Sequence, residues 1–180
     1  MYGIINKALE ELVTETFGTE VWENIKIKSK INIDYFISNQ SYNDQITYDI
    51  AIAISEETKT PLNVILTLFG EWWILRTAKE KYGSLLSFGG KNIKEFLVHL
   101  PDLHTRVMLL YPHLTPPEFK ILNSEEKSIV LEITSSRMGL QDFVTGLFQG
   151  ISKLYETKTK IEILNFSETN KTIISYKISW

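Results

Sequence analysis

The chain has 180 residues, no cysteine and a formal net charge of −3. This length suits one domain with a substantial core, and the absence of cysteine excludes disulfides, thiolate metal sites and cysteine nucleophiles within the chain. Lysine and arginine are not clustered, which argues against a nucleic-acid or membrane-binding patch. No apolar run reaches the ~18 residues of a membrane span, and the N-terminus lacks the features of a signal peptide. We therefore expect a soluble, cytoplasmic protein.

The first two-thirds of the chain is predicted to be helical. Apolar residues recur there at helical spacing, and Gly18 and Pro61 stand where helices should stop and start. The expected helices cover residues 4–16, 20–29, 42–57, 61–77 and 91–111.

The pattern changes after Pro117. Residues 129–137, 159–166 and 171–180 alternate between apolar and polar side chains, as half-buried strands do, while 140–156 is helical in pattern. We expect an α+β fold in a single domain, 1–180. A helical N-terminal subdomain, about 1–60, should pack on the remainder, about 61–180, which holds an antiparallel sheet with helices.

One stretch concentrates unusual residues. FLVHLPDLHTRVMLLYPHLTPPEF, residues 96–119, holds all three histidines and four of the five prolines. On a helix, His104 shares a face with four apolar or aromatic residues within about 40° of it. These residues are Leu97, Leu100, Met108 and Tyr111.

An imidazole in an apolar stripe allows two interpretations. His104 is either a core histidine with both nitrogens hydrogen-bonded, or a metal ligand or buried proton carrier. His99 and His113 point elsewhere, and no HExxH, HxH or acidic pair indicates zinc. If His104 binds a metal, it is therefore the sole protein ligand, which is how proteins hold haem iron in an apolar pocket.

ITSSR, residues 133–137, is a second candidate site. Ile133, Ser135 and Arg137 point to one face of a strand, where a guanidinium and a hydroxyl suit carboxylate groups. The alternative is an ordinary strand end with a surface arginine.

Several motifs occur together in a specific order. They are MYGIINKALEELV, FGTEVWENIK, TYDIAIAIS, FGEWW, YGSLL, LPDLHTRV, YPHLTPPEF and SSRMGLQDFVTG. In this order the chain resembles, along nearly its full length, the H-NOX family of haem-binding nitric oxide and oxygen sensor domains. That family includes the haem domain of the soluble guanylate cyclase β subunit and bacterial stand-alone proteins.

The resemblance implies one haem b per chain, buried between the two subdomains, with His104 as the proximal iron ligand. It places Pro117 and Ile5 against the macrocycle, where they would distort it. The family's Tyr-x-Ser-x-Arg motif for the propionates falls on Ile133, Ser135 and Arg137, with isoleucine in place of tyrosine. Leu100 and Met108, one turn either side of the histidine, would also contact the haem.

The resemblance also implies the distal ligand pocket, for which the expected residues are Phe143, Trp73, Leu147 and Ile4. Family members that bind oxygen use a distal tyrosine, and that position falls on Phe143, which has no donor. Without a donor, O₂ should bind poorly, whereas NO and CO should bind. Trp73 is the complication, because its indole N–H is a possible donor or a core side chain.

We expect a non-enzymatic haem sensor of NO. Release of His104 and relaxation of the haem would carry the signal to a separate histidine kinase or diguanylate cyclase, as the resemblance implies. The alternatives are an O₂ or redox sensor, a haem enzyme, and a haem-free interaction module of the same fold.

Overall fold

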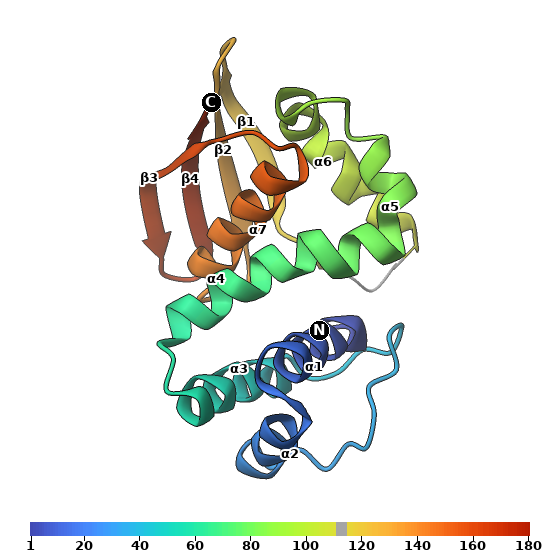
Figure 1. Ribbon diagram of the computed structural model, residues 1–180. Helices are drawn as coiled ribbons and strands as arrows, with labels where there is room; N and C mark the ends of the chain where they lie inside the picture. Colours follow the sequence, from blue (N-terminus) through green and yellow to red (C-terminus); the bar gives the residue numbers. More distant parts are fainter. Residues whose placement is uncertain (111–114) are drawn as a thin grey trace.

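The computed structural model describes residues 1–110 and 115–180 and shows a helical N-terminal part below a second part built on a sheet (Figure 1). The helices are α1 Gly3–Phe17, α2 Thr19–Lys28, α3 Asp44–Thr58, α4 Leu62–Trp72, the π-helix η1 Trp73–Ala78, α5 Lys79–Ser87, α6 Ile93–Leu110 and α7 Gln141–Leu154. The strands are β1 Glu118–Ser124, β2 Ser128–Ser135, β3 Lys160–Glu168 and β4 Thr172–Ser179.

Helices α1, α2 and α3 form the N-terminal subdomain around their own core. Leu9 and Val13 of α1 lie one turn apart and are at most 1% exposed, as are Ile25 of α2 and Ile54 of α3. Asn43 is the N-cap of α3, and its side-chain oxygen accepts a hydrogen bond from the backbone N–H of Gln45 at 3.0 Å.

The second core lies on the inner face of the sheet. The four strands are antiparallel in the order β1-β2-β4-β3. Every second residue of the two central strands is at most 1% exposed: Ile129, Leu131, Ile133, Ile174, Tyr176 and Ile178. The α7 helix lies between this sheet and α4 (Figure 1), and α6 packs beside β1. Among the described residues, no helix is both long and apolar enough to cross a membrane.

The α4 helix joins the two cores. Its Ile65 and Phe69 belong to the N-terminal core, whereas Ile74 and Ala78 of the following π-helix belong to the sheet core. Because α4, η1 and the start of α5 run on without a loop, one helical segment joins the two cores before the chain kinks at Tyr82 (Figure 1).

The α4 and α7 backbones touch at two glycines. A Cβ on Gly70 would lie 2.1 Å from the carbonyl oxygen of Phe143, and one on Gly146 would lie 2.0 Å from that of Thr67. Neither oxygen can move without its helix, so both positions require glycine. The contact brings Phe143 of α7 against Phe69 of α4, with ring centroids 5.1 Å apart.

The α+β fold class expected from the sequence is confirmed, and the expected helices and strands are present with small shifts at their ends. Three features differ. The expected helix 61–77 ends at Trp72 and continues as a π-helix and then as α5, and the sequence did not predict α5. The sequence also did not predict β1, Glu118–Ser124, which lies at a sheet edge and is largely exposed.

Gly146→Ala should lower the free energy of unfolding by about 1–3 kcal/mol, the usual effect of overpacking a rigid site. Chemical denaturation monitored by circular dichroism measures it. The matched control is Gly83→Ala in α5, where a Cβ meets nothing within 4 Å and helix propensity favours alanine. Equal stability of the Gly146→Ala protein and its parent would contradict the close contact between α4 and α7.

Candidate haem site

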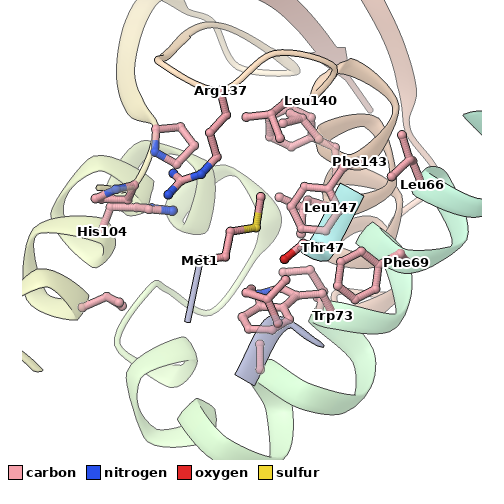
Figure 2. Close-up of a pocket in the computed structure, with 18 of the residues that line it drawn as sticks. Met1, Thr47, Leu66, Phe69, Trp73, His104, Arg137, Leu140, Phe143 and Leu147 are labelled. Atoms are coloured by element: carbon pink, nitrogen blue, oxygen red, sulfur yellow. The ribbon is translucent and has the colours of Figure 1, made fainter. Parts of the chain in front are cut away.

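A cavity of about 380 Å³ lies between the two parts of the protein. Nearly all of its lining is apolar and comes from α1, α3, α4, η1, α5, α6, α7, β1 and the segment before β1. Figure 2 shows His104 on one wall, Arg137 at the top, and Phe69, Trp73, Phe143 and Leu147 on the opposite wall. The volume is in the range of ordinary ligand pockets.

His104 presents one ring nitrogen to this cavity. Its Nδ1 lies 3.1 Å from the carbonyl oxygen of Leu100, one turn earlier in α6. Since a carbonyl oxygen only accepts, Nδ1 carries the proton and Nε2 keeps its lone pair. In the described part of the chain Nε2 has no hydrogen-bond partner. The residue is thus not a core histidine with both nitrogens bonded.

Burial keeps His104 neutral. Desolvation lowers the pKa of His104, and the hydrogen bond to Leu100 offsets part of that shift. Neutral imidazole is the form that binds a metal. His104 therefore offers a correctly protonated single nitrogen ligand inside an apolar cavity.

The wall opposite His104 is aromatic. Phe69 packs against Phe143 and, edge to face, against Trp73 at 6.5 Å between ring centroids. Thr47 also lines the cavity, but its hydroxyl donates to Oδ1 of Asn6 at 2.7 Å. Tyr48 likewise donates to the carbonyl oxygen of Met138 at 3.2 Å. Both hydroxyl protons are therefore committed within the protein.

Arg137 forms an ion pair at the edge of the cavity. Its Nε donates to Asp44 at 2.8 Å, and its two terminal nitrogens donate to the backbone and side-chain oxygens of Thr115 at 2.5 and 3.1 Å. A guanidinium has five N–H donors. Counting only described partners, two remain for a further anion. Asp44 is also bound by the α-amino group of Met1.

The structure brings most of the sequence-predicted site residues to the cavity. Those that line it are His104, Leu100, Pro117, Ile5, Arg137, Phe143, Trp73 and Leu147. Tyr111 and His113 lie outside the described residues. His99 is separate, with its Nδ1 3.2 Å from the carbonyl oxygen of Gly89.

Four expected contact residues are not among the described residues that line the cavity. Met108 is 39% exposed, because α6 turns that face toward solvent beyond His104. Ile4 is buried but is turned away from the cavity, which its neighbour Ile5 lines. Ile133 is 1% exposed in the sheet core, and Ser135 accepts a hydrogen bond from the backbone N–H of Arg137.

Sequence patterns missed Asp44, Thr115 and Phe119. Asp44 and Arg137 are 93 residues apart in sequence, and nothing local in either segment indicates their pairing. Phe119 packs its ring on His104, with centroids 4.4 Å apart. It lies in β1, the strand that the sequence did not predict.

A family model described as Haem-NO-binding matches residues 2–163. The chain belongs to the Haem-NO-binding family. H-NOX domains of this family are haem-based gas-sensor domains, and the residues around the cavity fit a haem group. A free histidine Nε2 suits the iron, an apolar cavity suits the macrocycle, and the arginine at its edge suits carboxylates.

Curated relatives agree with this family. The soluble guanylate cyclase gcy-31 of Caenorhabditis elegans is 25% identical over 92% of this chain, and the match covers 24% of that protein. The guanylate cyclase soluble subunit beta-2 of Rattus norvegicus is 29% identical over 59% of this chain and 16% of its own length. The chain spans about a quarter or less of the length of these relatives.

Solved H-NOX structures share the fold. An unliganded Fe(II) H-NOX mutant from K. algicida superposes with a TM-score of 0.88, at 21% identity and with 99% of this chain and 96% of that one covered. A mutant H-NOX of T. Tengcongensis gives a TM-score of 0.87 at 21% identity, with 99% and 97% covered. The expected H-NOX fold is confirmed.

The ion pair of Asp44 predicts a pH dependence of stability. Burial raises the pKa of Asp44, but the α-amino group and Arg137 together outweigh that effect and lower it. A depressed folded-state pKa stabilises the protein above the unfolded-state value and is lost as the pH falls through the folded-state value. Asp44→Asn should therefore lose less stability than the parent between roughly pH 5 and pH 2.

Asp142 supplies a control of opposite sign, because burial raises the pKa of its carboxyl. Asp142→Asn should lose more stability than the parent over the same range, since a group that favours protonation in the fold has been removed. Urea denaturation at a series of pH values measures both. Parallel curves for Asp44→Asn and its parent would contradict the ion pair.

Proposed function

We propose that this protein is a haem sensor selective for nitric oxide. It would bind one haem b per chain, non-covalently, with His104 as the protein ligand. The observation that supports the proposal is the Nε2 of His104, which has no hydrogen-bond partner among the described residues and faces an apolar wall across the cavity. Ferrous haem, when bound, supplies an iron that can take a diatomic gas.

Arg137 would hold a haem carboxylate with its remaining N–H donors. Asp44 and Thr115 fix the guanidinium at the edge of the cavity and leave two donors for that anion. Pro117 and Ile5 line the cavity and would bear on the macrocycle. Ile133 provides no second donor, because its side chain is a hydrocarbon, and it is buried in the sheet core.

The gas selectivity rests on the donors of the opposite wall. Bound O₂ carries partial negative charge and depends on a hydrogen-bond donor in the pocket, whereas NO and CO do not. Phe143 and Leu147 have none, and the hydroxyl protons of Thr47 and Tyr48 are engaged elsewhere. Trp73 is the donor that keeps an O₂ sensor as the second candidate.

His104 would also carry the signal. The bond from the imidazole of His104 would join the haem to α6, so a gas that weakens this bond would free the haem from the helix. We propose that His104 leaves the iron when NO binds and that the two parts of the protein shift in response, a two-state element biased by a ligand. The protein would have no catalytic activity of its own. We also propose a cytoplasmic location and a separate histidine kinase or diguanylate cyclase as its partner.

His104→Gly should abolish the histidine-ligated ferrous absorption spectrum, and added imidazole should restore it by filling the space left by the side chain. Absorbance of the freshly purified protein is the measurement. His99→Ala is the matched control and should leave the spectrum unchanged, because His99 contacts Gly89 rather than the cavity. A His104→Gly protein with the parent spectrum and no imidazole would refute the assignment of the ligand.

The ferrous protein should show the same spectrum under air as under nitrogen, because Phe143 provides no hydrogen-bond donor for O₂. With NO, the protein should show the spectrum of haem without a histidine ligand. With CO, it should show the spectrum of haem that keeps its histidine ligand. Phe143→Tyr should raise O₂ affinity by roughly 10- to 150-fold if its hydroxyl donates to the ligand. O₂ binding by the parent that Trp73→Phe abolishes would favour the O₂ sensor instead.

A further inference from the structure

Among the described residues, two contacts restrain the ring of His104, and one of them comes from its own helix. The Nδ1–H bond to Leu100 stays within α6. The ring of Phe119 lies against the imidazole from another element, with centroids 4.4 Å apart and planes inclined at 36°. That geometry is close to offset stacking, the arrangement that aromatic pairs prefer.

Phe119 is itself held firmly. It lies near the start of β1, and its backbone pairs with Ile133 of β2, which is 1% exposed. The side chain is half-buried, packs on the sheet core and lines the cavity. Phe119 therefore gives His104 a fixed surface that belongs to the sheet and not to α6.

The two contacts restrain different motions. A hydrogen bond at Nδ1 fixes one atom of the imidazole, but rotation of the ring about the Cβ–Cγ bond has broad energy wells. An aromatic surface on one face of the ring opposes that rotation. The direction in which Nε2 points into the cavity is thus determined by the hydrogen bond and Phe119 together.

We propose that Phe119 is the positioning residue for His104: it aims Nε2 and thereby sets the strength of the bond between His104 and the haem iron. The inference rests on the proposed function. Without the stacked ring, the imidazole samples more orientations, so the bond weakens and His104 leaves the iron more readily. Because β2 ends at Ser135, two residues before Arg137, the pair of strands that holds Phe119 would also lead to the carboxylate-binding arginine.

The first test is resonance Raman spectroscopy of the unliganded ferrous protein. Phe119→Leu should lower and broaden the iron–histidine stretching band and speed the release of His104 by NO about 2- to 10-fold, the worth of an aromatic pair. Phe119→Tyr, which keeps the ring, should restore both values. Phe119→Met tests the same point in case the leucine variant does not retain haem.

Phe96→Leu is the matched control. Phe96 lies on the same helix as His104 and lines the same cavity, but its ring packs on Tyr155, with centroids 5.5 Å apart. Its replacement loosens the core without touching the imidazole, so the band should stay in place. An unchanged band in Phe119→Leu and Phe119→Met, or an equal shift in Phe96→Leu, would overturn the proposal.

A second test does not depend on haem. In NMR spectra of the haem-free full chain, the ring current of Phe119 should shift the ring protons of His104 upfield, and Phe119→Leu should remove that shift. His99 is the internal reference. A parent without bound haem would refute the proposed function alone, whereas His104 shifts that ignore Phe119→Leu would refute the stacking.

Discussion

The backbone contact between α4 and α7 at Gly70 and Gly146 is the constraint on which the rest of the structure depends. This contact sets the distance between α4, which joins both cores, and α7, which covers the sheet. Phe69 and Phe143 meet only because these backbones approach so closely. A side chain at either glycine would force the helices apart and widen the wall opposite His104, so the shape of a gas-binding pocket depends on two residues that do not line it.

Local pattern was enough to predict most of the secondary structure. Amphipathic spacing located the long helices, and alternation located the strands whose inner residues are buried. The β1 strand was missed because it follows two prolines, lies at a sheet edge and is exposed over most of its length, so its sequence does not alternate clearly. The π-helix and α5 were missed because the break at Trp73 changes the hydrogen-bond spacing without any glycine or proline to mark it.

The site was predictable only as far as local pattern and resemblance reach. His104 and Arg137 were predicted and both line the cavity, but Phe119 beside His104 and Asp44 beside Arg137 were not predicted. Helical offset grouped Met108 with His104, although Met108 is 39% exposed. Strand alternation grouped Ile133 with Arg137, although Arg137 lies beyond the end of β2. Asp44 and Phe119 act through contacts made by chain segments that meet only in the folded protein. Such contacts depend on how distant segments are brought together by the fold, and the local periodicity of the sequence carries no information about that.

The ion pair with Asp44 lowers the entropic cost that Arg137 would meet on binding a carboxylate. A free arginine side chain loses rotamer freedom when it grips a carboxylate, at a cost of about 2 kcal/mol. Here Asp44 and Thr115 already hold the guanidinium from three of its donors, so that ordering occurs on folding rather than on binding. The arginine is a preorganised anchor, and an arriving carboxylate would meet a rigid receptor. In the proposed haem site, this preorganisation would partly compensate for isoleucine standing at position 133 in place of the motif's tyrosine.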